Sequence, residues 1–167
     1  PIVRELLSEI VLVDEAHLEQ AVNAYLTLQK TMAEGAGAAG LAAMLVKPEK
    51  FRGRKIGLIL CGGNIDARIL ASIMVRELER EDRIVSFRLT IPDQPGVLGQ
   101  IATRLGQLGA NILGVEHRRL FLDVPAKGAK LDVTVETRDR AHGAKIFNAL
   151  EGDGFQPVWI DTATMME

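Results

Sequence analysis

The sequence predicts two unlike parts, an α/β segment over residues 1–80 and an α+β domain of the ferredoxin-like type over residues 83–167. In the first part, short continuous apolar runs alternate with helical patterns, as in a sheet whose strands are buried on both faces. In the second part, strands of alternating polarity and two amphipathic helices follow in the order βαββαβ. The charged run "ERED", residues 79–82, lies between them and is expected to be a solvated helix end.

Two apolar runs are the predicted strands of the first part. They are residues 10–13 ("IVLV") and residues 55–61 ("KIGLILC"). Continuous apolar runs of this length are typical of strands that are covered on both faces. Two strands do not complete such a sheet, and the chain starts at Pro1, without an initiator methionine, shortly before the first of them. We therefore expect this part to be a fragment of a longer domain.

Three helices are predicted around these strands. Asp14 can cap the first, because its carboxylate can accept free amide protons of the first turn. The second is the glycine- and alanine-rich run that starts at Glu34, and Pro48 should end it. The third follows the turn of residues 62–64 and carries apolar residues at helical spacing, namely Ile65, Ile69, Ile73 and Val75.

The second part can be assigned to elements along its whole length. Apolar and polar residues alternate over residues 85–91, which predicts a strand with one solvated face. A helix over residues 97–108 carries an apolar stripe, and Gly109 stands where a left-handed C-terminal cap is needed. The remaining predicted elements are strands at 111–121, 130–136 and 155–160 and a helix over 139–150. With both helices on one face of the sheet, the other face is expected to be solvated or used for pairing.

The turn between the first strand and the first helix of this part, residues 93–96 ("DQPG"), is a candidate binding site. The first turn of a helix has unpaired amide groups, which favour an anion such as the carboxylate of an amino acid. Asp93 could cap this helix or bind an ammonium group, and Asn111, just past the helix, could reach the polar end of a ligand. The alternative is that Asp93 is only a cap and the tetrapeptide only a turn.

Composition excludes several function classes. With 167 residues, 47% hydrophobic and 25% charged, the sequence is that of a globular protein. A net charge of −2 and an aromatic content of 4% give neither a basic field nor stacking platforms, so we expect no nucleic-acid partner. The most apolar run, residues 35–46, is too short to cross a bilayer. A single cysteine and three scattered histidines predict no disulfide and no metal site, and we expect a cytoplasmic protein.

The stretch "FRLTIPDQPGVLGQIATRLGQLGANI", residues 87–112, resembles the opening of an ACT domain, a small module that senses amino acids. In that family the effector binds next to this turn, at an interface between paired ACT domains. The resemblance implies a set of candidate effector-binding residues on the turn and opposite it, namely Asp93, Gln94, Pro95, Gly96, Val97 and Leu98, with Asn111 and Ile112.

The first part resembles the C-terminal end of the catalytic domain of threonine dehydratases, which are fold-type II pyridoxal-phosphate enzymes. The motifs are "EGAGAAGLAA" from Glu34 and "LILCGGNID" around Cys61. The resemblance implies that Cys61 faces the pyridine nitrogen of the cofactor and that Glu34 lies near the ring. On residue type alone, Cys61 would be a buried thiol that ends a strand. No segment matches the family's Schiff-base lysine or its phosphate-binding loop, so we expect the chain alone to be inactive and not to bind pyridoxal phosphate.

Two functions remain open. The order of the parts resembles single-ACT threonine dehydratases (threonine ammonia-lyases), which implies a regulatory fragment of an enzyme that converts L-threonine to 2-oxobutanoate and ammonia. Its effector would be isoleucine, valine or a similar amino acid, and its ACT domains would pair in a homo-oligomer. The alternative is a freestanding ACT-type amino-acid sensor that regulates another protein. The missing methionine and the incomplete α/β part favour the first hypothesis.

Overall fold

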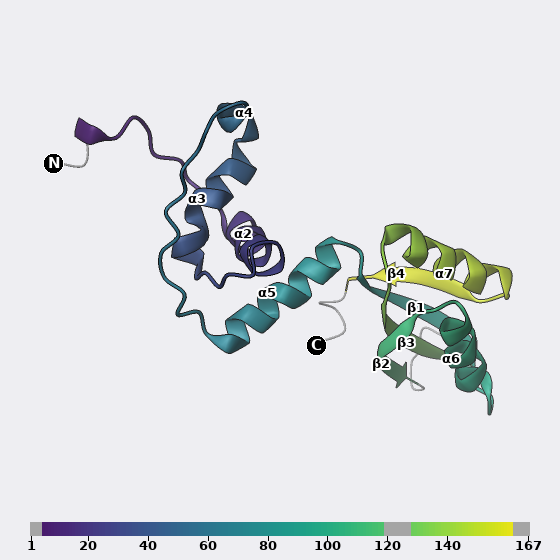
Figure 1. The fold of residues 1–167 in the computed structure, drawn as a ribbon. Coiled ribbons are helices and arrows are strands. Elements are labelled where there is room, and N and C mark those ends of the chain that lie inside the picture. The colour runs from purple at the N-terminus through teal and green to yellow at the C-terminus, as the bar shows by residue number, and fades with distance from the viewer. Residues whose placement is uncertain (1–4, 119–127, 162–167) are drawn as a thin grey trace. The chain divides into compact units, whose positions relative to one another are not determined.

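The computed structural model describes residues 5–118 and 128–161, which form two compact units, Pro1–Glu77 and Leu78–Glu167 (Figure 1). The first unit is built from helices and irregular segments. The second contains a four-stranded sheet with two helices.

The first unit is held together by a small helical core. Its helices are α2 (Glu15–Thr27), α3 (Gly35–Val46), the short α4 (Pro48–Phe51) and most of α5 (Ala67–Arg80). The core residues come mainly from α2 and α3 and are mostly small, namely Ala21, Val22, Tyr25, Ala33, Ala38, Ala42 and Ile73. Asp14 caps α2 as predicted, with its carboxylate accepting from the amide of His17 at 2.9 Å. Pro48 follows the end of α3 and begins α4.

The two strands predicted in this unit are absent. Residues 10–13 and 55–61 are irregular, and the side chains of Ile10, Leu12 and Ile59 are 73%, 85% and 88% exposed. A strand forms only where its backbone can pair with a neighbour. The described part of this unit offers these runs no such neighbour, so the prediction of buried strands here was wrong.

The second unit has the predicted βαββαβ order of a ferredoxin-like fold. Its elements are β1 (Ile84–Pro92), α6 (Val97–Gln107), β2 (Asn111–Arg118), β3 (Gly128–Glu136), α7 (Arg140–Gly152) and β4 (Gln156–Ile160). The strands are antiparallel in the order β2-β3-β1-β4, so β2 and β4 are the edges. The end of the predicted 111–121 strand and most of the loop after it lie outside the described residues.

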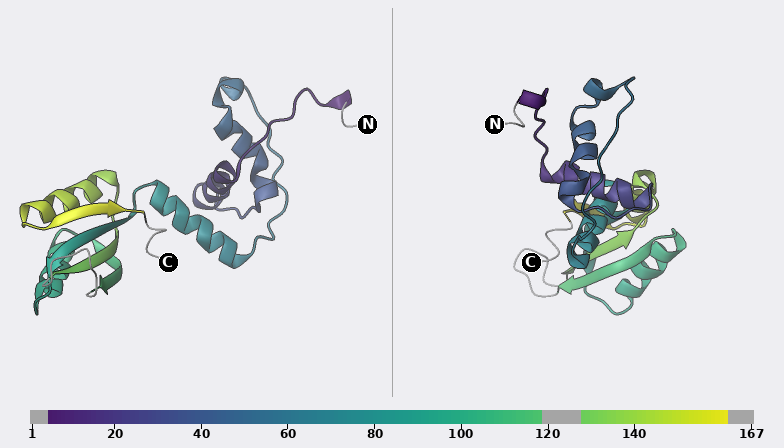
Figure 2. Two further views of the ribbon diagram at one scale, coloured as in Figure 1. Left: turned by 180° about the vertical axis from the view of Figure 1, so that it is seen from behind. Right: turned by 60° about the vertical axis from the view of Figure 1, so that its left-hand side comes forward.

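Both helices of this unit cover the same face of the sheet (Figure 2). The core between them consists of alternate strand residues and apolar helix residues, among them Phe87, Leu89, Leu131, Val133, Ile101, Leu105, Ile146 and Leu150. Gly109 has φ +82° and ends α6, since its amide and that of Ala110 bond back to Gly106 and Leu105. The predicted left-handed cap is confirmed.

The opposite face of the sheet is polar and paired within itself. The hydroxyls of Ser86 and Thr134 are hydrogen-bonded at 2.8 Å. Arg88 donates two hydrogen bonds of 2.6 Å to Asp132 on the neighbouring strand. On β1 and β3 this face therefore carries paired polar and charged groups, whereas on β4 it carries the exposed Val158 beside Arg88.

Candidate functional site

The β1–α6 turn leaves amide groups open at a helix N-terminus. The N-cap of α6 is Gly96, with φ +92°, which has no side chain that could cap the helix. Asp93 lies three residues before this N-cap, and its role as a capping group or as a ligand of an ammonium group stays a prediction. Gln94 donates from its backbone to Pro92 at 3.0 Å, whereas in the described structure the amide of Gly96 has no backbone acceptor. The turn has the free donors that an anion requires.

The candidate residues of this turn face solvent. Asp93, Gln94, Pro95, Gly96 and Leu98 are exposed, and Val97 is half-buried against the core. A side chain at Gly96 would meet no other atom within 4 Å, so the space around the turn is open. A left-handed residue without Cβ allows a ligand to approach the backbone closely.

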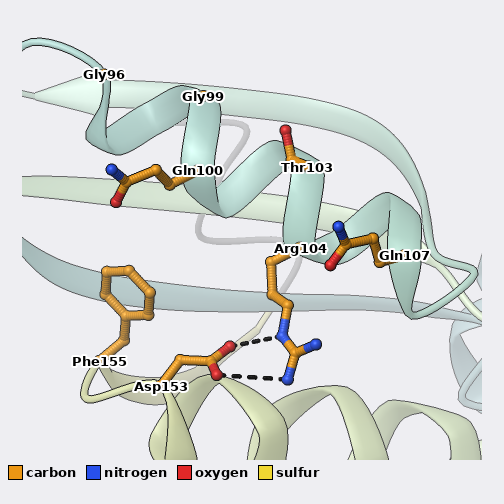
Figure 3. Close-up of a pocket in the computed structure, with 8 residues that line it drawn as sticks. All are labelled: Gly96, Gly99, Gln100, Thr103, Arg104, Gln107, Asp153 and Phe155. Carbon is orange, nitrogen blue, oxygen red and sulfur yellow. Dashed lines mark hydrogen bonds and ion pairs between the residues drawn. The ribbon is translucent and has the colours of Figure 1, made fainter.

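An open pocket of about 760 Å³ adjoins the turn (Figure 3). It lies along α6 and reaches the segment after α7, and its lining residues are Gly96, Gly99, Gln100, Thr103, Arg104, Gln107, Asp153 and Phe155. The guanidinium of Arg104 donates to both carboxylate oxygens of Asp153, at 2.6 and 3.3 Å. This pocket was not predicted from the sequence. The polar residues at helical spacing from Gln100 to Gln107 are the signal that could have found one wall of it.

Asn111 and Ile112 lie at the other end of α6. This helix has 11 residues, so its ends are about 16 Å apart at 1.5 Å per residue. Asn111 is exposed and lines a different pocket, whereas Ile112 packs partly against the core. One chain therefore brings the turn residues together and keeps Asn111 away from them.

Glu34 and Cys61, far apart in sequence, meet in the first unit. The backbone amide of Glu34 donates to the carbonyl of Gly62 at 2.9 Å. A Cβ on Gly62 would collide with the carboxylate of Glu34, and a Cβ on Gly37 would collide with the carbonyl oxygen of Cys61. The N-terminus of α3 thus packs against the 61–62 backbone through contacts that only glycine allows. Cys61 itself is exposed, which contradicts the interpretation as a buried strand-end thiol.

Charge pairing dominates the electrostatics of the described residues. Hydrogen bonds to Glu116 raise the pKa of Arg118, and those from His17 lower the pKa of Asp14. Lys50 likewise lowers the pKa of Glu9.

The described ranges contain no acidic, histidine or cysteine cluster that could hold a metal ion. Among the helices that the structure describes, none has the length and apolarity to cross a membrane.

Comparison with known proteins agrees with this geometry. Residues 85–152 match the ACT domain. L-threonine ammonia-lyase from Thermotoga maritima is 34% identical over 155 residues, covering 93% of this chain and 38% of that protein. The same enzyme from Geobacter sulfurreducens is 33% identical, covering 93% and 39%, and the biosynthetic L-threonine dehydratase from Haemophilus influenzae is 29% identical, covering 91% and 29%.

The chain thus spans less than two fifths of the length of the first two relatives. The predicted resemblance to a threonine dehydratase segment that includes an ACT domain is confirmed.

Proposed function

We propose that this chain is the regulatory C-terminal part of an L-threonine ammonia-lyase. It contains a match to the ACT domain and aligns with part of such enzymes. The whole enzyme would convert L-threonine to 2-oxobutanoate and ammonia in the cytoplasm. The ACT unit would bind an amino acid and thereby control the reaction. The observation that carries this proposal is the left-handed glycine N-cap of α6, Gly96, which faces solvent within the ACT match.

The apolar residues beside the turn favour an aliphatic effector such as isoleucine or valine. Its carboxylate would accept from the amides at Gly96, and its side chain would contact Val97 and Leu98, with Ile112 contributed by a second copy. An effector can shift the enzyme between states only by its difference in affinity for them. A hundredfold preference corresponds to about 2.7 kcal/mol.

Pairing of two copies through β2 would complete this site. The strand register places the end of β2 at the same end of the sheet as Pro92, which leads into the turn. In an antiparallel pair of β2 edges, the start of one strand lies beside the end of the other. Asn111 of one copy would then lie near Gly96 of the second. The edge at β4 is less suited, because it has five residues and Pro157 lacks an amide donor.

We further propose that the first unit forms one edge of a pyridoxal-phosphate site in the whole enzyme. Glu34 and the thiol of Cys61 lie beside the same 61–62 backbone, and Cys61 is open to solvent. The thiol of Cys61 would face the pyridine nitrogen of the cofactor, and Glu34 would lie near the ring. The cofactor, when bound, supplies the electron withdrawal that elimination of the β-hydroxyl needs. We expect the 167-residue chain alone to show no dehydratase activity and to bind no pyridoxal phosphate.

The exposed apolar runs also support a longer enzyme. Residues 10–13 and 55–61 present several exposed isoleucine and leucine side chains. Large exposed apolar surface marks an interaction site. In the whole enzyme these runs would be covered by other parts of the catalytic domain.

The alternative is a freestanding amino-acid sensor. Its support is that residues 78–161 include a complete sheet with its own core. Sequencing the gene upstream of Pro1 separates the two. A Schiff-base lysine in a fold-type II context supports the enzyme, and a start codon directly before Pro1 supports the sensor.

Calorimetric titration of the chain with isoleucine, valine, threonine and serine tests the effector site. We expect an aliphatic amino acid to bind the wild type and Gly96→Ala to weaken that binding about tenfold or more, because a side chain strains the left-handed turn. Gly53→Ala is the matched control, since Gly53 has φ +75°, equally open surroundings and a place outside the pocket beside the turn. Absence of binding by all four amino acids contradicts the proposed function.

A further inference from the structure

A second polar pocket lies at the opposite end of the ACT unit from the Gly96 turn. Its volume is about 460 Å³, and it is lined by Arg83, Gly109, Asn111, Glu136, Thr137 and Arg138. These residues come from the start of β1, the α6–β2 connection and the end of β3. Two guanidinium groups and one carboxylate therefore converge on one concave surface.

The two arginines of this pocket, unlike three other arginines of the unit, are not strongly paired with a carboxylate. Arg88, Arg104 and Arg118 each donate two hydrogen bonds to one carboxylate. Among the described residues, the ion-pair partner of the Arg83 guanidinium is Glu81, at 3.6 Å, and both side chains are about half exposed. For the guanidinium of Arg138, the described residues provide no ion-pair partner. Both groups thus retain the paired N–H donors that recognise a carboxylate.

Glu136 supplies the opposite charge at the same place. One of its oxygens accepts from the side-chain amide of Asn111 at 3.3 Å, which leaves acceptor positions of the carboxylate for another donor. Glycine at position 109 adds no side chain to the lining. An ammonium group can reach this carboxylate beside the two guanidinium groups.

We propose that this pocket binds the zwitterionic head group of the amino-acid effector, with Arg83 and Arg138 on the α-carboxylate and Glu136 on the ammonium. The inference rests on the proposed function and assigns residues that the turn alone does not supply. Asn111 begins the edge strand β2, so in the β2-paired arrangement the pocket opens toward the second copy's Gly96 turn. A carboxylate has about four acceptor positions, enough for the arginines and the turn amides together.

The test compares three ligands on the complete 167-residue chain by calorimetry. L-Isoleucine has both charged groups, L-isoleucinol lacks the carboxylate, and 3-methylpentanoate lacks the ammonium. The variants are Arg138→Gln, Arg83→Gln and Glu136→Gln. Arg140→Gln is the control, because Arg140 lies two residues from Arg138, is 91% exposed and is outside the pocket. Circular dichroism confirms that each variant is folded.

We expect isoleucine to bind about 10- to 100-fold more weakly to Arg138→Gln and Arg83→Gln, since each loses a hydrogen bond between charged groups. The same two variants should change isoleucinol binding little, and Glu136→Gln should weaken isoleucine more than 3-methylpentanoate. Arg140→Gln should behave as wild type.

Equal affinities of wild type, Arg83→Gln and Arg138→Gln for isoleucine overturn the pocket assignment and leave the proposed function intact. An equal loss in Arg140→Gln also overturns it, because the effect is then that of net charge. If the wild type binds none of the aliphatic amino acids, both the pocket assignment and the proposed function fail.

Discussion

The imidazole of His142 joins the two helices of the ACT unit, because its Nε2 lies 2.8 Å from the carbonyl oxygen of Leu108 at the end of α6. On the other side of the ring, Nδ1 accepts from the backbone amide of Arg138 at 3.1 Å. This pair of contacts assigns the proton to Nε2. His142 is buried in α7, so the ring makes both contacts from within the fold.

Replacing His142 with leucine should lower the free energy of unfolding by about 2–4 kcal/mol, because the carbonyl of Leu108 and the amide of Arg138 lose their partner and the buried ring is replaced. Urea unfolding measures the change. Lys145→Leu on the exposed side of the same helix is the control and should change stability by less than about 0.5 kcal/mol. Equal stability of both variants would contradict the bridging role.

Removing one partner of the ion pair between Arg88 and Asp132 should strongly destabilise the fold. Asp132 is 1% exposed, and its two oxygens accept from Arg88 at 2.6 Å. We expect Asp132→Ala to lower the free energy of unfolding by about 3–5 kcal/mol, because the mostly buried guanidinium of Arg88 loses its carboxylate partner. The double variant Arg88→Met, Asp132→Leu should recover most of this loss. A double variant less stable than Asp132→Ala would show that the charges themselves are needed.

The cap of α2 predicts a pH dependence. The backbone amide of His17, and then its ring, lower the pKa of Asp14. A lowered folded-state pKa means that the stabilisation is present above the ordinary aspartate pKa of about 3.9 and is lost as the pH falls through the lower folded value. The amide-proton shift of His17, followed by NMR, should therefore titrate with a midpoint below about 3.9. Asp14→Asn keeps a cap acceptor and should abolish the titration, and a wild-type midpoint above 3.9 would contradict the assignment.

Pairing through β2 predicts an asymmetric response of the two sheet edges. Val115 on β2 and Val158 on β4 are 43% and 59% exposed. We expect Val115→Lys to shift the mass measured by light scattering from that of a dimer toward that of a monomer, because like charges would meet across the paired edges. Val158→Lys should leave the mass unchanged. The reverse pattern would place the interface at β4.

The sequence predicted the second unit well because its signals are local. Alternation in β1 and β3 and the stripe of α6 each follow from a periodicity within one element, and Gly109 follows from the need for a left-handed residue. The charges on the open face were not predicted, since the pairing of Arg88 with Asp132 depends on the register between strands.

The first unit shows where such reasoning fails. The apolar runs at residues 10–13 and 55–61 have strand composition, yet strand formation depends on a neighbour that the sequence of the run does not contain. Likewise, only part of the candidate site could be predicted from the sequence. Gly96 can be identified from the turn residues, whereas the convergence of Arg83, Glu136 and Arg138 needs the folded sheet.

The packing of α3 against the 61–62 backbone can be tested with a variant and a control that both lie in α3. A Cβ at Gly37 would collide with the carbonyl oxygen of Cys61, whereas a Cβ at Gly35 meets nothing within 4 Å. Gly37→Ala should therefore push the 61–62 segment away and break the hydrogen bond from the amide of Glu34 to Gly62. Hydrogen exchange of the Glu34 amide should become about tenfold faster or more, corresponding to a local loss of about 1.4 kcal/mol.

Gly35→Ala is the matched control for this experiment, because it adds the same methyl group to the same helix without a collision. Alanine also has the higher helix propensity, so this variant should be equal to or slightly more stable than wild type. Reaction of Cys61 with a thiol reagent gives a second reading, since the chain has one cysteine and its segment moves only in Gly37→Ala. Identical exchange and identical thiol reactivity in the two variants would show that α3 does not hold the Cys61 backbone, and the proposed meeting of Glu34 and Cys61 at one cofactor edge would lose its structural basis.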